Sequence, residues 1–212
     1  MIFSPGRWAV WGAAALLSAC ASAPLHYYTL VPAAADVGAE PATAQTPASL
    51  PFELLPVSVP AQVDQPQLVV RRGGQSVVLL SGERWIAPLS DELRSALSTD
   101  LTGQLHSRNV TGLPSSGQPR LRIKLDVQRF DSLPGSYALI DATWSVRLLS
   151  DTSASRSAPK TVACSSRVNE SVGPGYDALV QGHQRAIAQV AAQIATAARA
   201  LSAGTALVCP AS

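Results

Sequence analysis

Three stretches between residues 121 and 169 alternate apolar and polar residues, and this pattern constrains the fold more than any other feature of the chain. Side chains of a β-strand point alternately to opposite faces, so alternation predicts strands with one buried and one solvated face, as in antiparallel sheets. Pro134-Gly135 and the Ser-rich run 150–159 supply the two connections. We therefore predict a three-stranded meander whose apolar face carries Leu121, Ile123, Leu125 and Val127, then Ile140, Ala142, Trp144, Val146 and Leu148, and more weakly Val162, Cys164 and Val168.

Two amphipathic helices are predicted to cover that face. Residues 90–105 carry a stripe with leucine at every fourth position, and Ser90 is the expected cap before the dipole-favoured Asp91 and Glu92. Residues 176–201 carry a second stripe, which Gly204 would end. Two helices and a largely antiparallel sheet, each apolar on one side, give an α+β two-layer sandwich.

Shorter extended segments precede these elements. Residues 25–31 suit a strand, and residues 52–60 suit one that Pro56 and Pro60 interrupt or confine to a sheet edge. Gly73-Gly74 between two apolar runs predicts a hairpin over 67–72 and 76–80. The Ala/Pro-rich stretch 33–51 reads as a flexible loop.

The N-terminus has the order of a bacterial lipoprotein signal. Arg7 precedes an uncharged apolar run at 8–17, and Leu17-Ser18-Ala19-Cys20 matches a lipobox. We expect residues 1–19 to be the signal peptide and Cys20 to carry the lipid that anchors one periplasmic domain, residues 20–212; the alternative is a secretory signal with a chance cysteine. Ala21 instead of Asp after that cysteine favours the outer membrane.

Net charge and cysteine content limit the kinds of function that the chain could have. The chain holds 16 Lys and Arg against 14 Asp and Glu, and loss of Arg7 with the signal leaves about +1, which argues against a polybasic binder of nucleic acid or phospholipid headgroups. Cys164 and Cys209 remain as an even pair in an oxidising compartment; a disulfide would close about 45 residues and contribute about 4 kcal/mol, the alternative being two thiols. We expect no metal, cofactor or enzymatic activity, because His26, His106 and His183 lack ligand spacing and no catalytic motif is present.

Several segments, taken in order, resemble one family. They are Tyr27-Tyr28-Thr29-Leu30, the run Val63-Asp64-Gln65-Pro66-Gln67-Leu68-Val69, Arg84-Trp85-Ile86-Ala87-Pro88-Leu89, Val127-Gln128-Arg129-Phe130 and the strand with Trp144. This order resembles the PqiC-like ABC-type transport auxiliary lipoproteins. The resemblance implies a domain similar to the N-terminal domain of TolB. It also implies an accessory role in moving lipids or other apolar molecules between membranes, with MCE-domain proteins or ABC transporter components as partners. The stretch 33–51 is longer than the gap between the first two strands that the resemblance implies.

Five residues are candidates for partner binding, each with a structural alternative. Asp64, Pro66 and Gln67 form either a contact loop or a turn. Trp85 is either an exposed anchor or a core residue beneath the first helix. Phe130 falls out of phase with its strand, which indicates a bulge or an exposed contact.

The sequence thus favours a non-catalytic, membrane-anchored docking module of a transport system. The alternative is a structural or assembly lipoprotein of the outer membrane. A homo-oligomer is a further possibility, because the long Ala-rich helix could present its outer face to a second copy.

Overall fold

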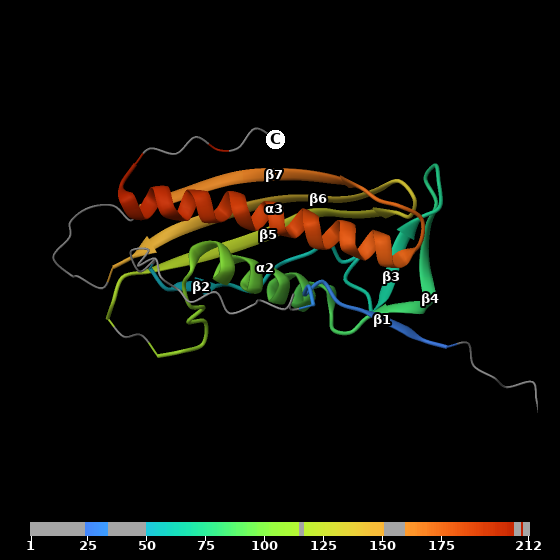
Figure 1. The fold of residues 1–212 in the computed structure, drawn as a ribbon, viewed down its shortest axis with the longest axis horizontal. Coiled ribbons are helices and arrows are strands. Elements are labelled where there is room, and N and C mark those ends of the chain that lie inside the picture. The colour runs from blue at the N-terminus through green and yellow to red at the C-terminus, as the bar shows by residue number, and fades with distance from the viewer. Residues whose placement is uncertain (1–23, 34–49, 115–116, 151–159, 206–208, 210–212) are drawn as a thin grey trace, which may run out of the picture.

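The computed structural model describes residues 24–33, 50–114, 117–150, 160–205 and 209 (Figure 1). Cys20, almost all of the 33–51 loop and nearly all of the Ser-rich connection at 150–159 lie outside these residues. The elements are β1 (His26–Tyr28), β2 (Phe52–Leu54), β3 (Gln67–Arg71), β4 (Val77–Trp85), α2 (Leu89–Leu105), β5 (Arg120–Leu133), β6 (Tyr137–Leu149), β7 (Thr161–Ser171) and α3 (Tyr176–Ala203).

The larger sheet has the strand order β2-β5-β6-β7. β5, β6 and β7 pair antiparallel, so the predicted meander is confirmed, and Gly135 in the β5–β6 turn has a φ of 73° that favours glycine. β2 pairs parallel with β5 at the edge of the sheet and ends before Pro56, as the prolines predicted.

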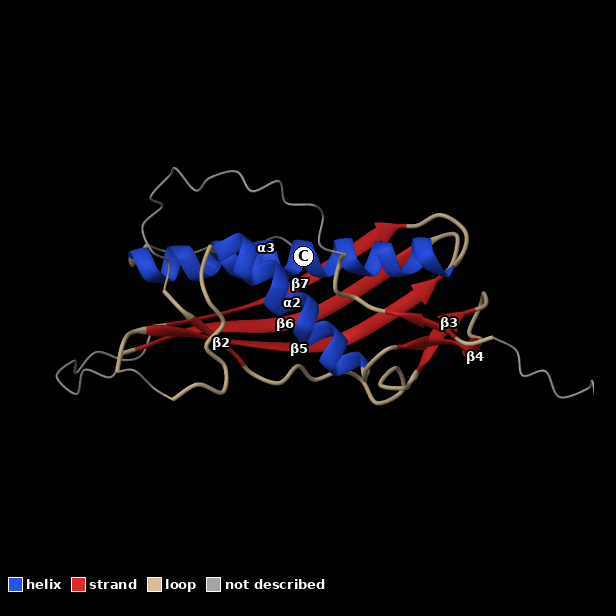
Figure 2. Ribbon diagram, turned by 60° about the horizontal axis from the view of Figure 1, so that its bottom comes forward, coloured by secondary structure: helices blue, strands red, loops and turns tan. Residues whose placement is uncertain are grey.

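Both helices pack on one face of this sheet (Figure 2). The predicted stripes are buried, and the alanines of α3 that face the core, such as Ala186, Ala191 and Ala195, are fully enclosed. These small side chains let the helix approach the sheet closely. The α+β class with two helices over a largely antiparallel sheet is therefore confirmed. None of the described helices is long and apolar enough to cross a bilayer.

The start of α2 differs from the sequence-based expectation. Pro88 occupies the N-cap position and no side chain caps the helix, so the prediction that Ser90 is the cap is wrong. The helix begins one residue earlier than expected, which places Ser90 inside its first turn. Glu92 in that turn is buried and accepts hydrogen bonds from Thr29 Oγ1 and the Leu30 backbone N–H, both at 2.8 Å. It ties the N-terminal segment to α2.

A second, three-stranded sheet has the order β1-β4-β3 and stands at one end of the molecule (Figure 1). β3 and β4 form the predicted hairpin, with positive φ angles of 98° and 55° at Gly73 and Gly74. β1 joins β4 in parallel. The strands before α2 thus divide between two sheets, which the sequence pattern did not separate.

Cys164 and Cys209 form a disulfide with their Cα atoms 5.6 Å apart, as expected from the even cysteine pair. Cys164 lies on β7, the last strand of the larger sheet, and Cys209 follows α3. The bond therefore joins Cys209 to β7.

At Gly182, α3 lies very close to Val172, which follows β7, and to Ala138 of β6. A Cβ at this position would overlap Val172 Cγ1 and lie 3.0 Å from Ala138 Cβ. We predict that Gly182→Ala lowers the free energy of unfolding by about 1–3 kcal/mol through overpacking, measured by urea denaturation. Gly103→Ala is the matched control, because its Cβ meets nothing within 4 Å and alanine raises helix stability by about 0.5–1 kcal/mol. Equal effects of both substitutions would contradict the close packing at Gly182.

Candidate functional site: a groove between the two sheets

A bulge in β5 creates the most distinctive local geometry of the chain. Up to Val127 the odd-numbered residues of β5 are buried, but the register to β6 shifts between Val127 and Arg129. Gln128 and Arg129 are consequently both exposed, and Phe130 turns inward. Of the two readings of Phe130, the bulge is confirmed, and the residue is 6% exposed.

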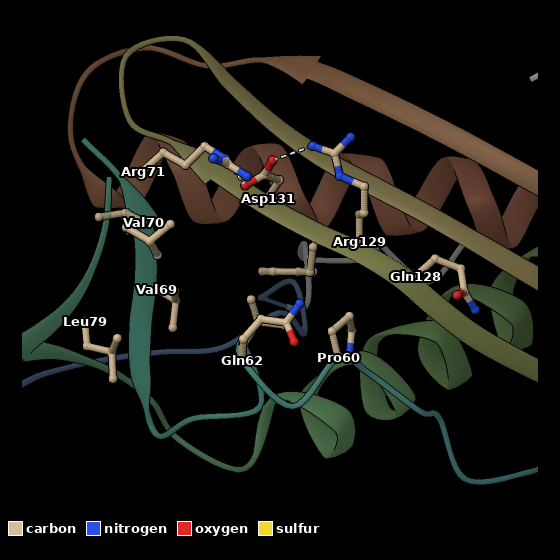
Figure 3. Close-up of a pocket in the computed structure, with 12 residues that line it drawn as sticks. Pro60, Gln62, Val69, Val70, Arg71, Leu79, Gln128, Arg129 and Asp131 are labelled. Carbon is tan, nitrogen blue, oxygen red and sulfur yellow. Dashed lines mark hydrogen bonds and ion pairs between the residues drawn. The ribbon is translucent and has the colours of Figure 1, made fainter. Parts of the chain in front are cut away.

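Beside this bulge, β3, β4 and β5 enclose an open groove of about 300 Å³ (Figure 3). Its apolar wall is formed by Val63 from the loop before β3, Val69 from β3, and Val77 and Leu79 from β4. Val77 and Leu79 are 49% and 52% exposed, which is unusual for aliphatic side chains facing a common hollow. The groove is thus an apolar surface that the fold leaves open.

The polar end of the groove is a three-residue ion cluster. Asp131 accepts a hydrogen bond from Arg71 Nε at 2.5 Å and another from Arg129 Nη2 at 2.7 Å. Burial of Asp131 opposes its ionisation, but the two guanidinium groups outweigh this and lower the pKa of Asp131. The same hydrogen bond raises the pKa of Arg71. The cluster links β3 to β5 and carries one net positive charge.

Aromatic packing supports the groove from behind. The Phe130 ring stacks on the His183 ring of α3 at 3.9 Å between centroids, and the Trp85 ring meets Phe130 edge-on at 6.1 Å. Trp85 is 5% exposed. The reading of Trp85 or Phe130 as an exposed partner anchor is therefore wrong, because both side chains fill the core beneath the groove.

Asp64, Pro66 and Gln67 lie in the turn that leads into the groove. Val63 and Asp64 donate backbone hydrogen bonds to the Pro60 carbonyl at 3.0 and 3.2 Å, and Trp85 donates one to the Pro66 carbonyl at 2.9 Å. The segment is thus a structured turn fastened to β4. Asp64 and Pro66 are exposed beside the buried Val63, while Gln67 begins β3. Partner binding by these three residues stays a prediction.

Sequence reasoning missed a buried polar pair on the core side of the bulge. His183 is fully buried, and a hydrogen bond of 2.8 Å joins its Nε2 to Ser132 Oγ, while its Nδ1 has no partner. Burial lowers the pKa of His183 to about 3, although the charge of Asp131 acts in the opposite direction. The only signal in the sequence was Phe130 falling out of phase, since the bulge also turns Ser132 inward. Within the described residues, no group of His, Cys, Asp and Glu could hold a metal ion.

The buried histidine predicts a pH dependence of stability. Its pKa is about 3 in the folded chain against 6.5 as the ordinary value, so below about pH 6.5 the unfolded state binds a proton that the folded state does not. Stability is therefore present above that pH and falls as the pH drops, by up to about 1.4 kcal/mol per pH unit.

His183→Gln removes this titration and keeps a hydrogen-bonding side chain next to Ser132. Urea denaturation of both proteins from pH 7 to about pH 4 should show wild type losing stability faster than the variant. The two proteins differ only at position 183, so parallel profiles would contradict a buried, neutral His183.

Comparison with known proteins places this chain in a family. A family profile described as the ABC-type transport auxiliary lipoprotein component matches residues 28–195. A solved structure described as an uncharacterized protein is 20% identical, with a TM-score of 0.60, covering 82% of this chain and 99% of that chain. Protein XCC0632 from Xanthomonas campestris is 17% identical, with a TM-score of 0.55 and coverage of 86% and 98%. These two likenesses concern the fold.

Among curated proteins, no relative matches the chain. The family profile nevertheless spans all of α2, α3 up to residue 195 and every strand of the two sheets except the first two residues of β1. The resemblance seen in the sequence is thereby confirmed, and the chain belongs to the ABC-type transport auxiliary lipoprotein family.

Proposed function

We propose that this chain is a lipid-anchored, non-catalytic accessory protein of an ABC/MCE-type transport system that handles lipids or other apolar molecules. In this proposal Cys20 carries the lipid, the domain lies at the periplasmic face of the envelope, more specifically at the outer membrane, and the groove docks an MCE-domain protein or a transporter component. Family membership supports the link to ABC-type transport. The observation that carries the docking role is the open groove itself.

Two properties of the groove suit docking. Val77 and Leu79 leave about half of their side-chain surface in water, so covering them on association would be favourable. The walls are also held in place before any partner arrives, because Phe130 is packed behind them and the Arg71–Asp131 ion pair ties β3 to β5. A preformed surface loses less conformational entropy on binding.

The same site offers little for catalysis. Ser132 and His183 pair a hydroxyl with an imidazole behind the groove, but they are only 4% and 0% exposed, and the His183 ring lies under Phe130. A substrate in the groove would not reach them. The His183 pKa of about 3 also keeps the imidazole a weak base. Both features favour a binding role over an enzymatic one.

The docking role predicts the outcome of crosslinking in the native envelope. A photo-crosslinking amino acid in place of Leu79 should capture an MCE-domain protein or an ABC transporter component. The same amino acid in place of Thr143, an exposed residue of β6 on the open face of the larger sheet, is the matched control and should not. Leu79→Asp should abolish function in an envelope-permeability assay and leave the unfolding midpoint unchanged, because Leu79 is half exposed.

Absence of such a partner at position 79, or equal capture from both positions, would overturn the docking role. Capture of an outer-membrane β-barrel instead would favour the assembly reading. Neighbouring genes for MCE-domain and permease proteins would independently support transport.

A further inference from the structure

Three of the exposed large apolar side chains gather at the N-terminal edge of the smaller sheet. Leu25, Tyr27 and Ile86 are 48%, 58% and 67% exposed. Tyr27 belongs to β1, Leu25 is the residue just before β1, and Ile86 directly follows β4. We call the surface formed by these three residues and Arg84 the tether face.

The strand register places these residues on one side. β1 pairs parallel with β4, with Tyr27 opposite Arg84 and Tyr28 opposite Trp85. Opposed residues of a parallel ladder point to the same side, and successive residues point to opposite sides. Trp85 is buried and Tyr28 packs against the core, so Tyr27 and Arg84 point away from it. Leu25 and Ile86 each lie two positions from one of them and therefore share the outer side, in keeping with their exposure.

The tether face is held rigidly to the domain. Glu83 accepts a hydrogen bond from the Tyr28 hydroxyl at 2.7 Å and contacts His26 Nδ1 at 3.0 Å. Ile86 donates its backbone N–H to the Tyr28 carbonyl at 2.9 Å, and buried Glu92 holds Thr29 and Leu30. Contacts with a surface at this face would consequently orient the whole domain.

The length of chain before the tether face identifies what covers it. Leu25 follows Cys20 by five residues, which span at most about 18 Å when fully extended. This step rests on the lipidation of Cys20 that belongs to the proposed function. With the acyl chains in the bilayer, Leu25 cannot leave the neighbourhood of the lipid headgroups.

The composition of the face suits that environment. Tyrosine is enriched at membrane–water interfaces. Aliphatic side chains lower their free energy when they leave water for the edge of the hydrocarbon layer. Arg84 adds a cation that attracts anionic headgroups. We propose that the tether face lies on the membrane, with Leu25, Tyr27 and Ile86 in the headgroup region.

This contact sets where the docking groove stands. β4 contributes Val77 and Leu79 to the groove at one end and leads into Ile86 at the other. The acyl chains supply most of the membrane affinity. The tether face then fixes the tilt of the domain, so that the groove is held at a constant orientation to the bilayer.

Spin-label accessibility tests the proposal on the full-length, processed protein in vesicles of phosphatidylethanolamine and phosphatidylglycerol. Single labels are placed at Ile86→Cys and Tyr27→Cys. Leu113→Cys is the control, because Leu113 is also an exposed apolar residue, at 65%, but lies in the loop after α2. Cys164 and Cys209 are bonded to each other, so the label reacts with the introduced thiol. The expected result is a higher ratio of oxygen to aqueous nickel-chelate collisions at 86 and 27 than at 113.

Mass spectrometry of the N-terminal peptide separates the possible failures. A lipidated protein whose labels at 86 and 27 are as open to the nickel chelate as the label at 113 overturns the tether face but leaves the docking role intact. Labels shielded from both reagents, with oligomers in light scattering, would show a second copy on this face and also overturn the proposal. An unmodified Cys20 would overturn the anchoring and the tether face together. Crosslinking from position 79 tests the docking role independently of the spin-label measurement.

Discussion

The architecture depends on one extra residue in β5. A regular strand would continue to bury its odd-numbered residues after Val127, which would place Arg129 in the core and leave Phe130 in water. The bulge at Gln128 prevents this, since Gln128 and Arg129 both stay exposed and Phe130 enters the core. The β5 side of the groove and the core behind it follow from that shift. Phe130 becomes its support, Asp131 meets Arg71 of the hairpin, and Ser132 reaches the buried His183.

The bulge also explains how the two sheets are joined. The β1-β4-β3 sheet forms no backbone ladder with the larger sheet among the described strands. It is held instead by side chains, through the Trp85–Phe130 contact in the core and the Arg71–Asp131 ion pair at the surface. Because side chains and not strand pairing join the two sheets, an apolar hollow stays open between them. Backbone pairing between the two sheets would have closed it. The family assigns the chain to ABC-type transport, and the junction provides the surface on which we place its docking role.

Much of this fold was predictable because its elements follow simple periodicities. The alternation of Leu121 to Val127 and of Ile140 to Leu148 indicated the meander, and the leucines from Leu89 to Leu105 indicated α2. Gly73-Gly74 and Gly204 marked the hairpin and the end of α3, because positive φ angles favour glycine. The pairing of β1 with β4 was not predictable, since a three-residue strand carries too little pattern to name its partner. The groove was hidden for a related reason: a bulge breaks the period from which burial is read, so the pattern did not mark Asp131 or Ser132, while Trp85 remained ambiguous between core and interface.

Asp131, which the bulge places beside the hairpin, fastens the hairpin to β5 through Arg71, and a double-mutant cycle on Arg71 and Asp131 measures this contact. Urea denaturation of Arg71→Ala, Asp131→Ala and the double variant gives the coupling free energy between the two side chains. We predict a coupling above about 1 kcal/mol, because the Asp131 side chain is only 12% exposed and the contact is short. A parallel cycle on Arg167 and Asp141, whose contact is 3.8 Å with the arginine 53% exposed, should give less than about 0.5 kcal/mol. If the effects of the two substitutions are additive within about 0.3 kcal/mol, the Arg71–Asp131 contact does not fasten the hairpin to β5.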